Sequence, residues 1–503
     1  MTHRRLALLL AAGAVALGAA AAGPAVASDP FAPGATLSQA PVDVRRTPVV
    51  FISLDEFALA SLLEAPGRID ARRYPNFAAL AAQGVWFPNA TPSADGTRWA
   101  TPAVLAGVRP DRRRIPAWTD YPTSLFTLLG RTHRLVVEEP VTRLCPPSLC
   151  PSHRLRGRTR RARARELTRL IPAAKRDAAR RSALAAFIRR IEPWRGGRPP
   201  LYYVDVLMPH HPYVWLPDGR RYAPPKPAMP GMHGDNLWRG DRALVERAWQ
   251  RYLLQVGYTD LLMGRLIRRL RATGLWDRAL LVVLPDHGVS FVPGRSRRTA
   301  TPATVGGIGA IPFFMKLPGQ RAGRRVDAHV ETIDVLPTVA AALGLPRPRG
   351  VDGHDALAPA FLPSPTVELW STTSVTTFGR RLYPMRLVQR RLAEVVAQQR
   401  ARFGTGAFGR RFFQLGPHAG LVGRAAGALP RGSRRVAAAL DAPARGAPAA
   451  VSGTVGGVGA GRNVAVVVGG RIAATARTYA FGGVRFAATV ARGGPVAVYA
   501  VPG

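Results

Sequence analysis

The stretch "LVVLPDHG" (Leu281–Gly288) places an acid and an imidazole directly after a run of apolar residues. Such a run indicates a strand that is buried on both faces, which is typical of a parallel sheet covered by helices. Two other segments, "TPVVFISL" (47–54) and "PLYYVDVL" (200–207), have the same form. Together with "ALLVVL" (279–284), they predict three buried strands of one sheet.

Acids and histidines follow each of these three predicted strands. Asp55 and Glu56 follow the first, His210 and His211 follow the second, and Asp286 and His287 follow the third. Ligands of an open parallel sheet bind at the carboxyl ends of its strands, so these side chains are expected to converge. A single Asp-His pair is also common in an ordinary strand-to-loop turn. The coincidence at three strand ends favours a divalent-metal site.

The segment "SADGTRWATPAVLAGVRP" (93–110) offers a nucleophile for such a site. Thr97 follows Asp95 and Gly96 and precedes a short helical pattern that Gly107 closes. A hydroxyl at a helix N-terminus lies where the dipole and free N–H groups favour an alkoxide and an incoming anion. The alternative is an ordinary capping residue, which the local pattern taken by itself favours.

Apolar runs alternate with helical patterns from Thr47 to about Leu362, which predicts an α/β fold with a mostly parallel central sheet. The clearest helical pattern covers 251–274, and a second one covers 331–345. The predicted domain organisation is a signal peptide at 1–27, a linker at 28–45, a catalytic domain at 46–365, a mixed connecting region at 366–444 and a small β-rich module at 445–503.

The N-terminus predicts export. Basic residues precede an apolar run, and Ala25-Val26-Ala27 has the small-x-small pattern of a cleavage site. An uncleaved membrane anchor is the alternative, and it exports the chain as well. Cys145 and Cys150 are the only cysteines, too few for a four-ligand zinc site. An exported chain is expected to bridge them, and two free thiols are the alternative.

The formal net charge of +41 comes almost wholly from arginine. One interpretation is a compositional habit, and the other is a surface that attracts anionic lipid, cell-wall phosphate or an anionic substrate. The Arg/Ala-rich stretch from Arg154 to Arg190 predicts a solvated helical excursion, or alternatively a membrane-surface patch. No nucleic acid is expected, because the basic residues are scattered and no recognition motif is present.

The ordered segments "VVFISLDEF", "YPNFAALAAQGVWFPNATP", "GTRWATPAVLAG", "LMPHHPYVWLPDG" and "LLVVLPDHG" resemble sulfatase-like hydrolases and transferases of the alkaline phosphatase superfamily. The resemblance implies an alkaline-phosphatase-like sandwich over roughly 46–362. It also implies that Asp55, Asp286 and His287 hold one metal ion, while Thr97 is both ligand and nucleophile. By the same likeness, His210 contacts the substrate or leaving group, and Glu56 and His211 are auxiliaries.

The chain departs from the sulfatase pattern at the nucleophile. Sulfatases that make formylglycine carry Cys or Ser in a C/S-x-P-S-R motif, and here Thr97, Trp99, Ala100 and Thr101 stand at its Cys, Pro, Ser and Arg. Because formylglycine cannot form from threonine, the chain is more similar to the branch that moves phosphoglycerol or phosphoethanolamine groups in cell envelopes.

The expected function is therefore a metal-dependent reaction on a phosphate or sulfate ester through a covalent Thr97 intermediate. One alternative is a sulfate or phosphonate ester hydrolase on the same scaffold. Another is a catalytically silent protein that binds the cell envelope. The expected cofactor is one divalent ion (manganese, magnesium, zinc or calcium), and the expected partner is an anionic ester, lipid- or cell-wall-linked. Peripheral contact with an anionic membrane is a further expectation.

Overall fold

The computed structural model describes residues 42–180, 182–221, 229–234, 236–372 and 378–502. The predicted signal peptide and most of the predicted linker lie outside the described residues. Among the helices that the structure describes, none is both long enough and apolar enough to cross a bilayer.

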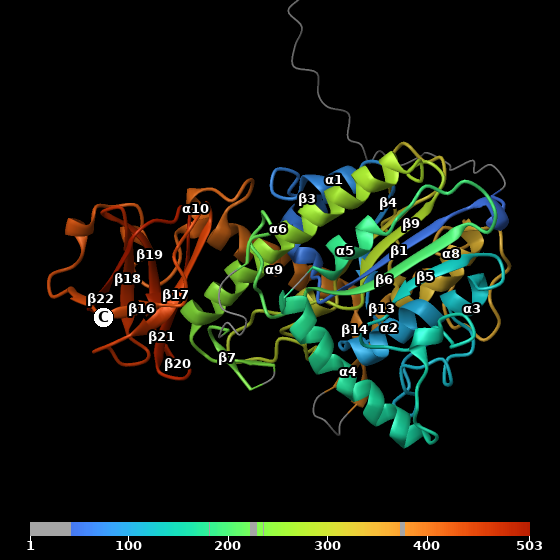
Figure 1. The fold of residues 1–503 in the computed structure, drawn as a ribbon, viewed down its shortest axis with the longest axis horizontal. Coiled ribbons are helices and arrows are strands. Elements are labelled where there is room, and N and C mark those ends of the chain that lie inside the picture. The colour runs from blue at the N-terminus through green and yellow to red at the C-terminus, as the bar shows by residue number, and fades with distance from the viewer. Residues whose placement is uncertain (1–41, 181, 222–228, 235, 373–377, 503) are drawn as a thin grey trace, which may run out of the picture.

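The central feature is an eight-stranded sheet (Figure 1). Its strand order is β11 (Arg324–Arg325), β4 (Val85–Thr91), β10 (Ile311–Lys316), β9 (Leu280–Pro285), β1 (Val49–Asp55), β6 (Pro200–Pro209) and β5 (Arg134–Glu138), with β12 (Val330–Glu331) beside β4. All pairings are parallel except those of β10 with β9 and β4. The predicted α/β class with a mostly parallel sheet is confirmed, and β1, β6 and β9 are the three strands expected from sequence.

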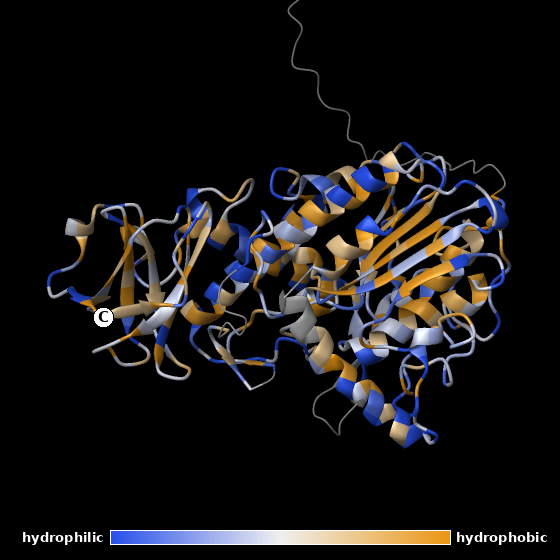
Figure 2. Ribbon diagram, in the orientation of Figure 1, coloured by the Kyte–Doolittle hydropathy of each residue, from blue (hydrophilic) through white to orange (hydrophobic). Residues whose placement is uncertain are grey.

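Helices cover both faces of this sheet, because side chains alternate between its faces along each strand. In β1, Val50, Ile52 and Leu54 belong to one core and Val49 and Phe51 to the other. The first core is completed by α1 (Pro75–Ala81), α5 (Ala183–Arg189), α6 (Arg242–Ala272) and α9 (Met385–Phe403). The second is completed by α2 (Thr97–Ala106), α3 (Leu125–Leu129) and α8 (Val335–Ala342). The orange strands of Figure 2 show how apolar this central layer is.

The predicted helices form, with shifted bounds. The pattern at 251–274 belongs to α6, which begins at Arg242 because Asp241 caps it by accepting from the Leu244 N–H. The pattern at 331–345 forms the short turn Thr332–Asp334 and then α8. The Arg/Ala-rich stretch forms α4 (Arg160–Arg180) and α5.

The C-terminal part contains two four-stranded antiparallel sheets, which lie at the left of Figure 1. One has the order β15 (Arg434–Val436), β22 (Val496–Val501), β18 (Asn463–Val468) and β19 (Arg471–Arg477). The other has the order β16 (Ala438–Leu440), β17 (Ala449–Val455), β21 (Val484–Val490) and β20 (Tyr479–Ala480). Their apolar faces share one core, so the two sheets form a sandwich.

Gly469 and Gly470 join β18 to β19, and both have positive φ, as tight hairpin turns require. The sandwich contacts the N-terminal half of α6, where the buried Arg247 donates from Nη2 to the Thr475 carbonyl at 2.8 Å. In sequence, the segment between α8 and the sandwich forms the hairpin β13 (Thr366–Thr372) and β14 (Phe378–Pro384), helix α9 and the short α10 (Arg410–Phe413). The antiparallel sheets begin at Arg434, upstream of the predicted boundary at 445.

Candidate active site

The three strand ends meet because β9, β1 and β6 are neighbours and parallel. Val49 of β1 is in register with Leu280 on one side and Leu201 on the other. Asp55, Asp286 and His210 consequently lie at one edge of the sheet, and all three are buried.

Thr97 joins this edge from a fourth strand. Strand β10 is antiparallel to both β4 and β9, so β4 and β9 run in the same direction. Because β9 is parallel to β1, β4 also runs in the direction of β1. The chain leaves β4 at this edge and begins α2 at Thr97, which Gly107 ends with φ 66°. The Thr97 hydroxyl lies 3.5 Å from Asp55 Oδ1, and it faces the positive end of the α2 dipole.

Asp95 holds the loop that presents Thr97. Its Oδ2 accepts from the Ala300 N–H at 3.0 Å and from the Ser371 hydroxyl, and its own N–H donates to the Trp370 carbonyl at 3.0 Å. The hydroxyl is therefore positioned by segments far away in the sequence.

Asp55, Asp286 and His287 form a cluster whose ligand atoms lie within 4.8 Å of one another. The Nδ1 of His287 lies 2.8 Å from the Gly288 carbonyl, which can only accept, so Nδ1 carries the proton and Nε2 carries the lone pair. That Nε2 is 3.8 Å from Asp55 Oδ1 and 3.6 Å from Asp286 Oδ2. Asp286 Oδ2 has no hydrogen-bond partner among the described residues. Two carboxylates and a neutral imidazole facing one point fit a divalent cation.

Burial is the main cause of the pKa shifts of His287 and Asp286. It lowers the pKa of His287 to about 3, an effect to which the Arg298 charge adds. It also raises the pKa of Asp286 to about 7, assisted by the nearby Asp205 carboxyl. A bound cation would favour the ionised carboxylate.

Arg298 is a site residue that the sequence reasoning missed. Its Nη2 lies 2.8 Å from His287 Nε2 and 3.3 Å from Thr97 Oγ1, and its Nε lies 3.2 Å from Glu56 Oε1. The only signal in the sequence was another pair of arginines in a chain rich in them. The guanidinium supplies a fixed positive charge beside the hydroxyl, where a substrate anion would be neutralised.

Glu56 faces two arginines, Arg297 and Arg298, instead of solvent. It is completely buried, ion-paired to the buried Arg297, and its backbone has φ 60°, which is strained for a non-glycine residue. Burial alone would raise the pKa of Glu56, but Arg297 and Arg298 lower it to about 2. The structure thus gives Glu56 a charge-balancing environment.

His210 lies between the cavity and Glu56. Its Nε2 is 3.3 Å from Glu56 Oε1, while its Nδ1 donates to the His211 carbonyl. Both ring nitrogens therefore face oxygen acceptors. The His211 ring packs edge-on against that of His210, with centroids 4.4 Å apart.

A cavity of about 820 Å³ opens above these residues. Asp55, Thr97, His210 and Arg298 line its polar part, together with Arg98. Its walls are largely apolar and are formed by Trp99, Pro116, Val141, Leu167, Ile171, Leu207 and Leu237.

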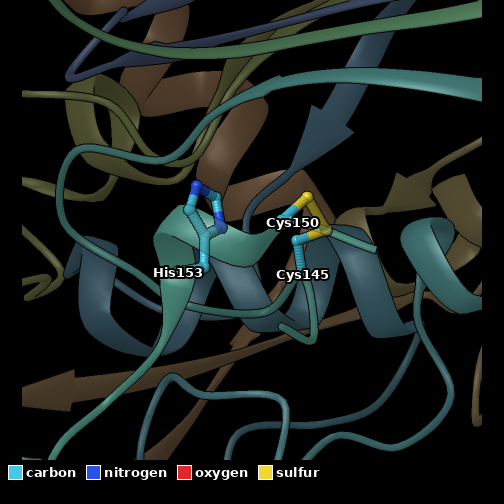
Figure 3. Close-up of side chains that lie close together, drawn as sticks. All are labelled: Cys145, Cys150 and His153. Atoms are coloured by element: carbon cyan, nitrogen blue, oxygen red, sulfur yellow. A yellow bond between two sulfur atoms is a disulfide. The ribbon is translucent and has the colours of Figure 1, made fainter. Parts of the chain in front are cut away.

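The predicted bridge between Cys145 and Cys150 is present. Figure 3 shows His153 beside it. The two sulfurs bond to each other and are not available as ligands, although they cluster with His153. His153 Nδ1 instead pairs with the buried Glu139 at 3.0 Å, and Glu139 accepts from the Leu144 and Cys145 N–H groups. These contacts stabilise the loop that carries Val141 into the cavity wall.

Part of the chain is similar to a known protein family. Residues 181–345 match the family model described as Sulfatase, so the chain carries a sulfatase-family segment. The resemblance to sulfatase-like proteins of the alkaline phosphatase superfamily is thereby confirmed, without any indication of the threonine branch. The matched residues include His210, Asp286, His287 and Arg298, whereas Asp55 and Thr97 lie outside them.

Individual relatives match over short regions. An ulvan-active sulfatase of Formosa agariphila is 26% identical over 165 residues, which are 31% of each chain. A multifunctional alkaline phosphatase superfamily protein of Trinickia caryophylli is 33% identical over 103 residues, 19% of this chain and 18% of that one. The chain thus matches a third or less of the length of these curated relatives. A phosphonate monoester hydrolase structure from Silicibacter pomeroyi covers 64% of this chain and 80% of its own, with 18% identity and a TM-score of 0.44.

Proposed function

We propose that this protein is an exported, metal-dependent ester hydrolase or transferase that acts on phosphate, phosphonate or sulfate esters through Thr97. The observation that carries the proposal is the position of the Thr97 hydroxyl. It begins α2, lies 3.5 Å from a carboxylate and 3.3 Å from Arg298, and faces a cavity large enough for an ester. An ordinary capping threonine would not need the partly buried guanidinium of Arg298 and a cluster of metal-type ligands beside it.

Asp55, Asp286 and His287 would hold the cation, with the Thr97 oxygen as a further ligand. A divalent ion there would neutralise charge on the ester and lower the pKa of the hydroxyl. Glu56 is proposed to balance the charge of Arg297 and Arg298, and His211 to position His210.

The chain's own residues account for the proton transfers. Thr97 Oγ attacks the phosphorus or sulfur and gives its proton to Asp55, while the bond to the leaving oxygen breaks and His210 protonates that oxygen. Water or an acceptor alcohol then attacks the Thr97 ester and gives its proton to His210. Asp55 returns a proton to the Thr97 oxygen as that bond breaks. Arg298 offsets the negative charge of the transferred group in both steps.

The test is a panel of soluble phosphodiesters, phosphonate monoesters and aryl sulfates with Thr97→Ala and Thr97→Ser. We expect Thr97→Ala to lose at least a thousandfold in kcat/KM, about 4 kcal/mol of barrier, and Thr97→Ser to retain much of it. Mass spectrometry of acid-quenched enzyme should find the transferred group on the peptide that contains Thr97. Near-normal turnover by Thr97→Ala would refute the assignment.

Within this class of reactions, hydrolysis of a sulfate ester is favoured by the match of residues 181–345 to the Sulfatase model. The same panel tests this, because the substrate with the highest kcat/KM identifies the ester class. Export and the domain boundaries at 27, 45 and 365 are part of the proposal, whereas the start of the C-terminal sandwich follows the structure and lies at Arg434. The mass of the secreted mature chain tests the boundary at 27.

A further inference from the structure

Helix α4 carries an unusual concentration of positive charge. Eight arginines lie within residues 154–169, and Glu166 is the only acid in residues 154–174. Arg161, Arg165 and Arg169 are exposed and follow one another at intervals of four residues. Because an α-helix turns 100° per residue, these three arginines form one stripe along its surface. In Figure 1, α4 extends along the lower edge of the α/β region, away from the central sheet.

The same helix forms part of the cavity above Thr97. Leu167, Thr168 and Ile171 line that cavity. Thr168 is exposed and lies three residues after Arg165, which makes the two neighbours on the helix surface, so the arginine stripe borders the cavity. Figure 2 shows hydrophilic and hydrophobic residues side by side along α4. A single helix therefore places a cationic surface and an apolar cavity wall next to each other.

The cavity has a matching polarity. Its floor holds Thr97, Arg298 and His210, while Val141, Ile171 and Leu237 line its walls. Leu237 is 46% exposed, which is high for a large apolar side chain at a cavity rim. Polar side chains such as His233, Asn236 and Ser296 also line the cavity, but most of its wall is apolar, and a hydrophilic glycan would gain little from that larger part. A ligand with an anionic ester at one end and an apolar body at the other fits both parts.

We propose that α4 docks the protein on an anionic lipid surface and that the cavity takes an amphiphilic ester from that surface. The arginine stripe would attract the anionic headgroups, and the apolar wall would receive the hydrophobic part of the ester. The choice of substrate rests on the proposed function, whereas the docking surface stands independently of the chemistry.

The docking surface is tested by sedimentation with lipid vesicles. Vesicles of equal parts phosphatidylglycerol and phosphatidylcholine should bind the wild-type chain in a salt-sensitive manner, and pure phosphatidylcholine should not. The stripe variant Arg161→Glu/Arg165→Glu/Arg169→Glu should bind at least about thirtyfold more weakly, since each basic residue near such a surface contributes several-fold in affinity.

The matched control is Arg431→Glu/Arg435→Glu/Arg492→Glu, which makes the same charge change at exposed residues of the C-terminal part. It should bind within about twofold of wild type. An equal loss in both variants would overturn the proposal, because net charge alone would then explain binding. Preference for a soluble anionic polysaccharide, with no binding to anionic vesicles, would overturn it as well. Circular dichroism and thermal unfolding show whether both variants are folded.

Turnover tests the substrate class. We compare a long-chain phosphodiester in anionic vesicles with its short-chain soluble analogue. The ratio of the two rates should fall at least about tenfold in the stripe variant and stay constant in the control. If the wild type binds vesicles better than the stripe variant but hydrolyses no ester, the docking surface is supported and the proposed function is refuted. If the wild type and the stripe variant hydrolyse both esters equally well, the proposed function is supported and the docking surface is refuted.

Discussion

Arg298 reaches Thr97 across two hundred residues of sequence: its Nη2 lies 3.3 Å from Thr97 Oγ1 and 2.8 Å from His287 Nε2. The same guanidinium pairs with the buried Glu56, which orients it. A fixed cation at this place can act on the nucleophile and on the charge that develops during transfer.

Arg298→Met should lower kcat/KM by about a hundredfold or more, because a preorganised donor beside the developing charge is lost. Arg298→Lys should recover only part of the rate, since an ammonium cannot span Thr97, His287 and Glu56 together. Steady-state kinetics on the best ester of the panel measures both. A rate within threefold of wild type in Arg298→Met would show that the arginine has a structural role only.

Metal binding should depend on Asp286. In a saturating excess of the correct ion, about a hundred times the Kd, the folded wild-type chain should gain about 2.7 kcal/mol of stability. Asp286→Asn should lose that gain. Thermal unfolding and calorimetric titration with manganese, magnesium, zinc and calcium measure the effect without any turnover. Glu246→Gln, far from the cluster, is the control and should respond as wild type. An equal gain in Asp286→Asn would place the cation elsewhere.

The buried Glu56–Arg297 pair should be costly to break. Glu56→Gln leaves an uncompensated guanidinium that is completely buried, so the free energy of unfolding should fall by about 3–5 kcal/mol. Glu56→Gln/Arg297→Met should recover much of this loss. Breaking the partly exposed pair of Arg402 and Glu246 with Glu246→Gln should cost less than about 1 kcal/mol. Urea unfolding of the wild type and the three variants measures these free energies. Equal losses of unfolding free energy in Glu56→Gln and Glu246→Gln would contradict the prediction.

Asp260 should give a measurable pH dependence of stability. It accepts from the backbone N–H groups of Asn76 and Phe77, yet burial raises its pKa from 3.8 to about 6. The folded chain therefore binds this proton more tightly than the unfolded chain does. Its contribution is fully present below about pH 4 and is lost as the pH rises to about 6.

Asp260→Asn removes that proton equilibrium and keeps an acceptor for the two N–H groups. The stability of wild type relative to Asp260→Asn should fall by about 2–3 kcal/mol between these pH values. Urea unfolding at several pH values measures the difference. A difference that does not change with pH would mean that the Asp260 carboxyl is already ionised at the lower pH.

The disulfide should contribute modestly to stability. Cys145 and Cys150 close a short loop, so Cys145→Ser/Cys150→Ser should lower the free energy of unfolding by about 2 kcal/mol in the chain-entropy treatment. Since this loop directly follows the segment that carries Val141 into the cavity wall, KM for apolar esters should rise more than kcat falls. An unchanged unfolding free energy would mean that Glu139 and His153 hold the loop by themselves.

Local sequence patterns are enough to predict the three buried strands, the polar residues at their ends, the helix that starts at Thr97 and the α/β class. These follow from local rules, because apolar runs, caps and glycines act within a few residues. Convergence of Asp55, His210 and Asp286 was also predictable, since parallel strands end at one edge of a sheet.

Which arginines lie in the site depends on how the chain folds. Arg297 and Arg298 resemble every other pair in this arginine-rich chain until folding places them against Glu56 and Thr97. The position of α4 beside the cavity also depends on the tertiary structure, because the same helical pattern can face solvent, a cavity or both. Burial turns a common side chain into a specific one: it removes the water that would otherwise screen its charge, and which side chains are buried depends on contacts distant in sequence.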